Sequence, residues 1–206
     1  MKNTAQESIG TGFFIDQKGH ILTNHHVVHN SIKVYIQLPK YGAKTYECEV
    51  ISVNPKLDIA LLKSVNYQNK GFLELGDSES IKKGDEVLAI GYPLGQDKIK
   101  ITGGIVSGFQ DGDIQTDSAI NPGNSGGPLL KNNKVVGINY AGHNGAQNVG
   151  YAIPMEYVKI NLPLMREKKF INFPVLCATF NNSNQTMMNV VSSCEEGYYV
   201  SKVLTG

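Results

Sequence analysis

The chain contains 206 residues, 41% of them hydrophobic, so it is long enough for one large or two small domains of ordinary soluble composition. A formal charge of +1 at pH 7 argues against nucleic acid or a membrane surface as its main partner. No apolar run approaches the roughly 20 residues of a membrane-spanning helix, and the first residues lack the apolar core of a secretory signal. We therefore expect either an intracellular protein or a fragment without its targeting segment, which leaves the compartment open.

Short apolar strands separated by turn residues are predicted throughout the first part of the chain. They lie at residues 10–15, 21–24, 34–38, 46–53 and 58–63. The first two flank a loop that contains Gly19, which is typical of a β-hairpin. The polar, turn-rich stretch 75–85 is then predicted to link two halves.

A second set of short strands is predicted after this linker. They lie at residues 86–90, 99–108, 114–116, 128–131, 135–140 and 149–153, with glycine, aspartate and asparagine turns between them. Many short strands of this kind indicate an all-β barrel or sandwich and not a sheet built from βαβ units.

The last part of the chain begins with a predicted helix over residues 155–169. Pro154 opens it, and apolar side chains recur at roughly helical spacing at Met155, Val158, Leu162 and Met165. Pro163 is expected to kink or end this helix. After Phe170 the composition changes, and residues 197–204 alternate like a strand. About 40 residues is short for an independent domain, so we expect only the front of a second one.

The stretch with the clearest chemical meaning is Gly-Asn-Ser-Gly-Gly-Pro-Leu at residues 123–129. A serine flanked by three glycines and followed by proline fits neither a helix nor a regular strand, so a tight turn that presents one hydroxyl is predicted. The uncovered N–H groups of such a turn can hold a developing oxyanion. Taken alone, the stretch around Ser125 could also be a plain surface turn.

This stretch resembles the nucleophile loop of trypsin-like serine proteases, with Asn124 in place of aspartate. The longer run at 116–128, Thr-Asp-Ser-Ala-Ile-Asn-Pro-Gly-Asn-Ser-Gly-Gly-Pro, resembles the HtrA/Deg branch of that class. The resemblance covers about residues 9–160, and it includes the segments 91–95, 101–108 and 148–154.

The same resemblance implies a catalytic triad of His26, Asp58 and Ser125. His26 stands in Thr-Asn-His-His-Val-Val, where the family has its general base, and Asp58 opens Asp-Ile-Ala-Leu-Leu, where it has the orienting acid. The residue types suit these roles, because a carboxylate holds one ring nitrogen of a histidine and so fixes its tautomer. The order His, Asp, Ser is that of chymotrypsin, and the N–H groups of Gly123 and Ser125 would form the oxyanion hole.

The family's fold is all-β, with two packed six-stranded antiparallel β-barrels of the trypsin-like type and a short C-terminal helix. The protease domain is expected at residues 8–163, with barrels at about 8–75 and 84–154. Residues 170–206 resemble an incomplete PDZ-like domain. The implied partners are unfolded or peptide substrates and, by the family's assembly, two further copies in a homotrimer.

The resemblance also assigns a pocket for the substrate side chain before the cleaved bond. Ala119 would lie at its base beside Ile120, and its wall would be formed by Asn139, Tyr140 and Ala141. Because no acid is available there, we expect cleavage after small or medium aliphatic residues; plain core packing of Ala119 and Ile120 is the alternative. A neutral Asn124 cannot pair with a new N-terminal amine, so activation by N-terminal cleavage is not expected.

A metal site is the first rival interpretation. His25 and His29 would share one face of a helix, as in a zinc motif, but the glutamate base and a third ligand are missing, so we expect no metal, no cofactor and no sensitivity to chelators. An odd, sparse set of cysteines does not form a disulfide framework, so buried or idle thiols are expected at Cys48, Cys177 and Cys194.

Two further alternatives keep the fold and change the function. One is a catalytically idle chaperone or protein-binding module, which a serine-directed fluorophosphonate label would distinguish from an active enzyme. The other is a cysteine protease of the same fold, which the serine at position 125 argues against. The function predicted from the sequence is that of an HtrA/Deg-like serine endopeptidase.

Overall fold

The structure, a computed structural model, describes residues 9–38, 42–92, 98–140 and 149–167, together with two short strands further on. The chain divides into two compact units, Met1–Ile171 and Asn172–Gly206. The second unit is described only in β12 (Ala178–Thr179) and β13 (Asn189–Val190), which pair antiparallel. The predicted strand at 197–204 and most of the predicted PDZ-like segment lie outside the described residues.

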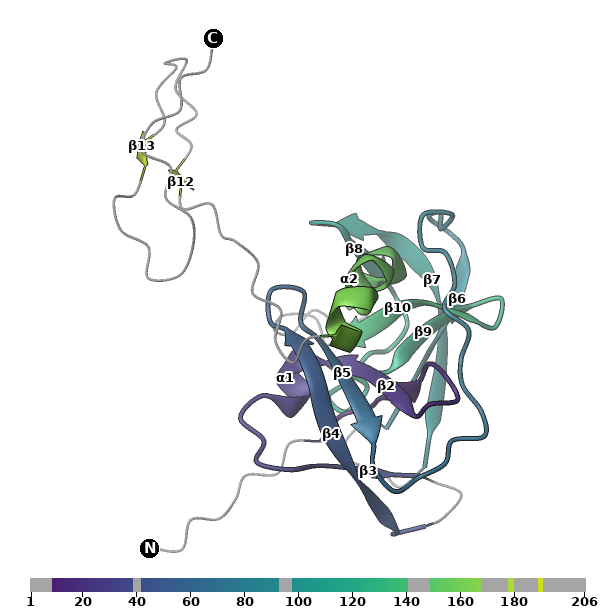
Figure 1. Ribbon diagram of the computed structural model, residues 1–206. Coiled ribbons are helices and arrows are strands. Elements are labelled where there is room, and N and C mark those ends of the chain that lie inside the picture. Colours follow the sequence, from purple (N-terminus) through teal and green to yellow (C-terminus); the bar gives the residue numbers. More distant parts are fainter. Residues whose placement is uncertain are drawn as a thin grey trace, which may run out of the picture. The chain divides into compact units, whose positions relative to one another are not determined.

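The first half of unit one forms an antiparallel sheet of five strands in the order β1-β2-β5-β4-β3 (Figure 1). These strands are β1 (Phe13–Phe14), β2 (His20–Asn24), β3 (Val34–Gln37), β4 (Thr45–Asn54) and β5 (Ile59–Ser64). Strand β5 lies in the middle and is almost entirely buried, as its continuous apolar run requires. Leu22 of β2 and Leu61 of β5 face each other fully buried at the centre of the sheet.

The predicted all-β class is confirmed, but this first half has five strands among the described residues where six were expected. The two outer strands are short: β1 has two residues and β3 has four. Strands of that length offer few ladder hydrogen bonds with which to close a sheet on itself.

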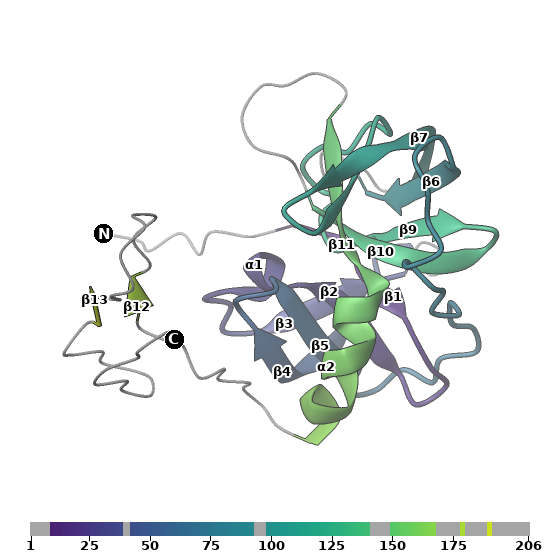
Figure 2. The ribbon, with the colours of Figure 1, turned by 90° about the horizontal axis from the view of Figure 1, so that it is seen from above.

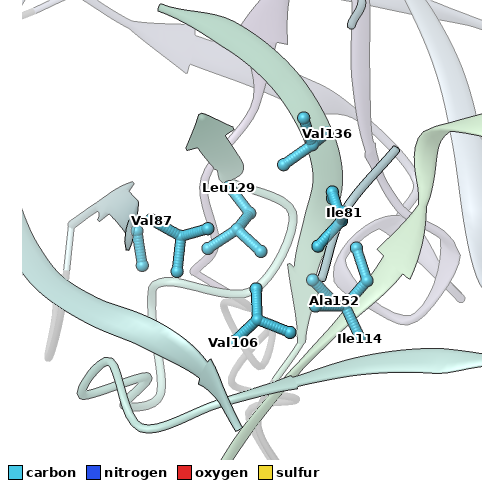
Figure 3. Close-up of a cluster of buried hydrophobic side chains, with 8 residues drawn as sticks. Ile81, Val87, Val106, Ile114, Leu129, Val136 and Ala152 are labelled. Atoms are coloured by element: carbon cyan, nitrogen blue, oxygen red, sulfur yellow. The ribbon is translucent and has the colours of Figure 1, made fainter. Parts of the chain in front are cut away.

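The second half of unit one is a closed barrel in the order β10-β11-β8-β7-β6-β9, which leaves no sheet edge unpaired. Its strands are β6 (Glu86–Gly91), β7 (Lys100–Gln110), β8 (Asp113–Thr116), β9 (Pro128–Lys131), β10 (Lys134–Tyr140) and β11 (Gly150–Pro154). Side chains from these strands point toward a common interior, which Ile81 of the preceding connection also enters (Figure 3). The six strands predicted for this half are therefore present.

Helix α2 (Met155–Glu167) follows β11 directly and packs against strands of both sheets, as the second view shows (Figure 2). Asn54 Nδ2 of β4 donates a hydrogen bond to Oδ1 of Asn161 at 3.4 Å, which ties the first sheet to the helix. The helix does not end at Pro163, contrary to one sequence-based expectation. Pro163 is exposed, so water can solvate the carbonyl one turn earlier that its missing N–H leaves unpaired.

Neither of the two helices described in unit one is both long and apolar enough to cross a membrane.

The barrel core yields a stability prediction. Ile114 of β8 is fully buried, whereas Ile101 of β7 is 60% exposed, so the pair compares one side chain in two environments. We expect Ile114→Ala to lower the free energy of unfolding by about 2–5 kcal/mol and Ile101→Ala by only about 0.5 kcal/mol, as measured by urea denaturation. Equal losses in the two variants would contradict the assignment of this core.

Candidate active site

His26 lies in the short helix α1 (His25–Val28), which begins directly after strand β2. Its ring nitrogen Nδ1 is 2.6 Å from Oδ2 of Asp58, and its main-chain N–H donates to the other carboxylate oxygen, Oδ1, at 2.8 Å. One carboxylate therefore holds both the backbone and the ring of the same histidine, which fixes the orientation of the imidazole. Both side chains remain partly open to solvent.

Asp58 reaches His26 from an uncommon backbone conformation, with φ at +52° in the turn before β5. Aspartate is one of the few residues other than glycine that tolerate this left-handed region. The carbonyl of Asp58 accepts hydrogen bonds from the N–H of His25 and from Nδ2 of Asn24, each at 3.0 Å. Carboxylate and carbonyl together thus tie this turn to three consecutive residues of the β2–α1 junction.

The contact with Asp58 distinguishes two adjacent histidines electrostatically. The hydrogen bond to the carboxylate raises the pKa of His26 above its ordinary value, against the opposing effect of burial. Burial lowers the pKa of His25, and the nearby His29 lowers it further. The His25 and His29 rings lie edge to face, with centroids 5.0 Å apart. Of the two adjacent histidines, His26 is therefore the one that suits a general base.

Ser125 lies in a glycine-rich loop, residues 118–127, that leads into β9 and that we call the serine loop. Gly123 and Gly126 have φ angles of +99° and +84°, which side chains rarely tolerate, and Ser125 itself is only 6% exposed. Main-chain hydrogen bonds of 2.8–2.9 Å hold the loop, from Asn124 to Asn121, from Gly127 to Asn124 and from Gly126 to Asn139.

The serine loop lies close to the segment of the chain that carries helix α1. A Cβ atom on Gly126 would lie 3.1 Å from the main-chain nitrogen of Asn24, the residue just before the helix. A Cβ atom on Gly10 would lie 3.2 Å from the carbonyl oxygen of Ser125 and 2.6 Å from Cγ1 of Val27. The serine loop therefore approaches the chain just before residue 26 directly, and the chain just after it with Gly10 in between.

Ala119 and Ile120 lie within the serine loop, a few residues before Ser125. The Ala119 carbonyl accepts hydrogen bonds from Thr102 Oγ1 at 3.1 Å and from Asn124 Nδ2 at 3.3 Å. Ile120 is partly buried against the barrel core, and its Cδ1 would lie 2.6 Å from a Cβ atom on Gly150. Ile120 thus occupies the space that the glycine leaves open.

The other residues predicted for the pocket wall have different surroundings. The buried side chain of Asn139 donates to the carbonyl of Pro128 at 3.0 Å. The hydroxyl of Tyr140 donates to Oδ2 of Asp113 at 2.5 Å. Ala141 lies outside the described residues. The side chains of Asn139 and Tyr140 are therefore engaged by the barrel and not by the serine loop.

Tyr140 faces a cavity of about 330 Å³ that also reaches Asp58, Asp113 and Tyr157. Burial raises the pKa of Asp113 above its ordinary value and outweighs the opposing effect of the hydrogen bond from Tyr140. Burial likewise raises the pKa of the Tyr140 hydroxyl. The members of this group come from the turn before β5, strands β8 and β10 and helix α2, so no local sequence pattern relates them and the sequence does not predict them.

The described residues contain no group of three or more histidine, cysteine, aspartate or glutamate side chains that could hold a metal ion. His25 and His29 lie side by side, but α1 ends at Val28, so the pair is a helix-end contact and not two successive turns of one helix face. Cys48 is a buried thiol whose pKa burial raises to about 11, which makes it unreactive at neutral pH. Cys177 and Cys194 lie outside the described residues.

Comparison with known protein sequences gives a consistent assignment. The sequence profile described as "Trypsin-like peptidase domain" matches residues 10–138. A protein of Chlamydia trachomatis called "Probable periplasmic serine endoprotease DegP-like" is 39% identical over 159 residues, which are 70% of this chain and 31% of that protein. The "Magnetosome formation protease MamE" of Paramagnetospirillum magneticum is 38% identical over 169 residues, 75% of this chain and 23% of that protein. The chain thus spans a third or less of the length of these relatives.

Solved structures agree with the sequence comparison. An "HtrA-type protease AlgW with decapeptide" has a TM-score of 0.74 and 31% identity, and the match covers 82% of this chain and 55% of that one. A serine endoprotease from Yersinia pestis has a TM-score of 0.72 and 28% identity, over 81% of this chain and 60% of that one.

The contact between His26 and Asp58 predicts a distinctive titration. In an NMR titration of the imidazole resonances, we expect His26 to titrate above the ordinary histidine value of about 6.5 and His25 below it. Asp58→Asn should lower the pKa of His26, because the amide cannot stabilise an imidazolium as the carboxylate does. Replacing each histidine by glutamine in turn would assign the resonances.

The raised pKa of His26 also makes the stability of the fold depend on pH. Since folding raises the pKa of His26, the contact with Asp58 stabilises the fold below about pH 6.5, and this contribution is lost as the pH rises through the higher folded value. A His26 resonance that titrates at or below that of His25 would contradict the assignment.

Proposed function

The chain belongs to the trypsin-like peptidase family, and on that premise we propose that it is an HtrA-like serine endopeptidase that hydrolyses peptide bonds of protein substrates through His26, Asp58 and Ser125. The observation that carries this proposal is the pair of hydrogen bonds from His26 to the Asp58 carboxylate. These bonds hold the imidazole on the helix that begins just after Asn24, and Gly126 of the serine loop lies against the main chain of Asn24.

In the proposed mechanism the Ser125 hydroxyl oxygen attacks the carbonyl carbon of the scissile peptide. With Nδ1 held by Asp58, Nε2 of His26 is the ring nitrogen that accepts the hydroxyl proton and later passes it to the leaving amine. Asp58 keeps the imidazole in one tautomer and stabilises the imidazolium that forms. The raised pKa of His26 supports this role, since it reports the preference of the site for the protonated ring.

The N–H groups of Gly123 and Ser125 are proposed to hold the negative oxygen of the tetrahedral intermediate. The left-handed φ of Gly123 supports this proposal, because it turns the chain sharply just before the nucleophile. A side chain at this position would strain that conformation.

For the substrate pocket we propose Ala119 and Ile120 at the base, with the backbone at Asn139, Tyr140 and Ala141 as the wall. The side chains of Asn139 and Tyr140 already have other hydrogen-bond partners, which favours a main-chain role for them. Asp117, an acid close in sequence, accepts a hydrogen bond from the N–H of Ile105 at 2.6 Å. It is therefore engaged by β7 and is not proposed to receive a basic substrate side chain.

The domain organisation stays a prediction. We propose a protease domain at 8–163, with halves at about 8–75 and 84–154, and an incomplete PDZ-like domain at 170–206. The division into compact units after Ile171 is compatible with this boundary and does not identify the second unit. A homotrimer and unfolded protein substrates remain proposals that rest on the similarity to HtrA proteases.

The proposed nucleophile is tested by removing its hydroxyl. Ser125→Ala should lower proteolysis of an unfolded protein such as casein by a factor on the order of 10⁶ and leave the circular dichroism spectrum unchanged. Asp58→Asn should cost about 10⁴, because it stabilises the wrong tautomer of His26. Ser52→Ala removes a buried hydroxyl that has no hydrogen-bond partner, and it should retain activity as a matched control.

A fluorophosphonate probe separates the enzyme from the alternative of an idle chaperone or binding module. The wild-type protein should be labelled at Ser125, and Ser125→Ala should not be labelled. Wild-type proteolysis in Ser125→Ala would disprove the assignment of the nucleophile. An unlabelled but folded wild-type protein would instead support the binding module.

The proposed pocket predicts which residue precedes the cleaved bond. Digestion of a peptide library, read by mass spectrometry, should show cleavage mainly after alanine, valine and other small or medium aliphatic residues. The physical reason is that Ala119 and Ile120 offer apolar surface and no carboxylate to pair with lysine or arginine. A strong preference for cleavage after arginine would contradict the proposed pocket.

A further inference from the structure

We propose that Thr11 is a positioning residue for the oxyanion hole, an inference that rests on the proposed function. Thr11 precedes β1 in the first half of the chain and is only 5% exposed. Its hydroxyl donates to the carbonyl of Gly123 at 2.6 Å, and its main-chain N–H donates to the carbonyl of Ser125 at 2.8 Å. One residue thus binds both of the residues whose N–H groups are proposed to hold the oxyanion.

These two bonds complete a series of fixed peptide planes in the serine loop. The carbonyls of Gly123 and Ser125 are held by Thr11, and the carbonyl of Asn124 between them accepts the N–H of Gly127 at 2.9 Å. Because a peptide unit is planar, fixing the Asn124 carbonyl also directs the N–H of Ser125, which belongs to the same unit. Each of the two flanking planes is held at its carbonyl by Thr11 and at its N–H by a loop bond, from Asn124 to Asn121 at 2.9 Å and from Gly126 to Asn139 at 2.8 Å.

The loop needs such external bonds because of its composition. Glycine imposes little steric restriction on its own φ and ψ angles, and the loop contains Gly123, Gly126 and Gly127. Without the Thr11 hydroxyl, the peptide unit that follows Gly123 would lose the donor that holds its carbonyl. That unit would then be held only by the bond from the Asn124 N–H to the Asn121 carbonyl at 2.9 Å, so the φ and ψ angles of Gly123, and with them the direction of its N–H, would be less restricted.

The orientation of the Thr11 hydroxyl is itself determined. Its oxygen accepts the N–H of Tyr92 at 3.1 Å, so its single proton is directed to the Gly123 carbonyl. The carbonyl of Thr11 accepts the hydroxyl of Thr23 at 2.7 Å, which anchors Thr11 to strand β2. Thr11 therefore links strand β2 of the first sheet to the serine loop of the barrel through hydrogen bonds on both sides.

Valine at position 11 is the informative substitution, because it keeps the branched shape of threonine and replaces the hydroxyl by a methyl group that cannot donate to the Gly123 carbonyl. The Cγ2 methyl of Thr11 lies close to Gly127, at 3.2 Å from where a Cβ atom on that glycine would be. Valine retains this methyl, so the packing of residue 11 against Gly127 is kept. Thr11→Ser is the complementary variant, since it keeps the hydroxyl and removes the methyl. Ser64→Ala is the control, because it removes a buried hydroxyl that donates to the Tyr67 carbonyl at 3.1 Å, in strand β5 and outside the site.

The experiment measures kcat and KM on a peptide substrate, and the rate of fluorophosphonate labelling, for the full chain at a temperature where each variant is folded. We expect Thr11→Val to lower kcat and the labelling rate by about 10²-fold with little change in KM, since a misplaced oxyanion hole acts on the transition state. Thr11→Ser should recover most of the activity, and Ser64→Ala should match the wild type.

The outcomes separate this proposal from the proposed function. Unchanged kcat in a folded Thr11→Val protein would overturn the role of Thr11 alone, and so would equal losses in Thr11→Ser or Ser64→Ala. Absence of Ser125-dependent hydrolysis in the wild type would overturn the proposed function and, with it, this inference.

Discussion

No side chain fits at residue 126, and the arrangement of the two halves depends on that constraint. A Cβ atom there would lie 2.2 Å from the carbonyl oxygen of Thr11 and 2.2 Å from Oγ1 of Thr23, both in the first half of the chain. Glycine therefore lets the serine loop of the barrel lie directly against the backbone of the first sheet. The hydrogen bonds from Thr11 to Gly123 and Ser125 are possible only at this close approach.

Residues of the same type near the site differ in their hydrogen-bond partners and, for the two histidines, in the direction of their pKa shifts. His25 and His26 are neighbours, but the hydrogen bond to Asp58 raises the pKa of His26, whereas burial and the nearby His29 lower the pKa of His25. Two aspartates reach the same cavity with different partners: Asp58 binds His26, and Asp113 accepts the hydroxyl of Tyr140. The proposed catalytic roles follow from these partners and not from residue type alone.

Local patterns predicted the elements well where the strands are short and bounded by turns. All six strands of the barrel, and the end of the second strand at Asn24, were predicted from such patterns. Tertiary contacts decided the exceptions. The helix continues past Pro163 because its buried residues, Met155, Val158, Asn161 and Met165, pack on one side while the proline faces solvent. The first sheet has the five strands that the local patterns predicted, one fewer than the six-stranded barrel that the family resemblance implied.

The sequence by itself determined the fold class and the candidate residues His26, Asp58 and Ser125, since each stands in a short motif whose residue types suit its proposed chemistry. Only the tertiary structure revealed that the Asp58 carboxylate binds both the ring and the backbone of His26, and that the side chain of Tyr140 is directed to Asp113. It alone revealed the role proposed for Thr11, which in the sequence is a small polar residue between two glycines. The physical reason is distance along the chain: hydrogen-bond partners 112 residues apart leave no periodicity or local motif. Their meeting depends on how the five-stranded sheet and the closed barrel pack together.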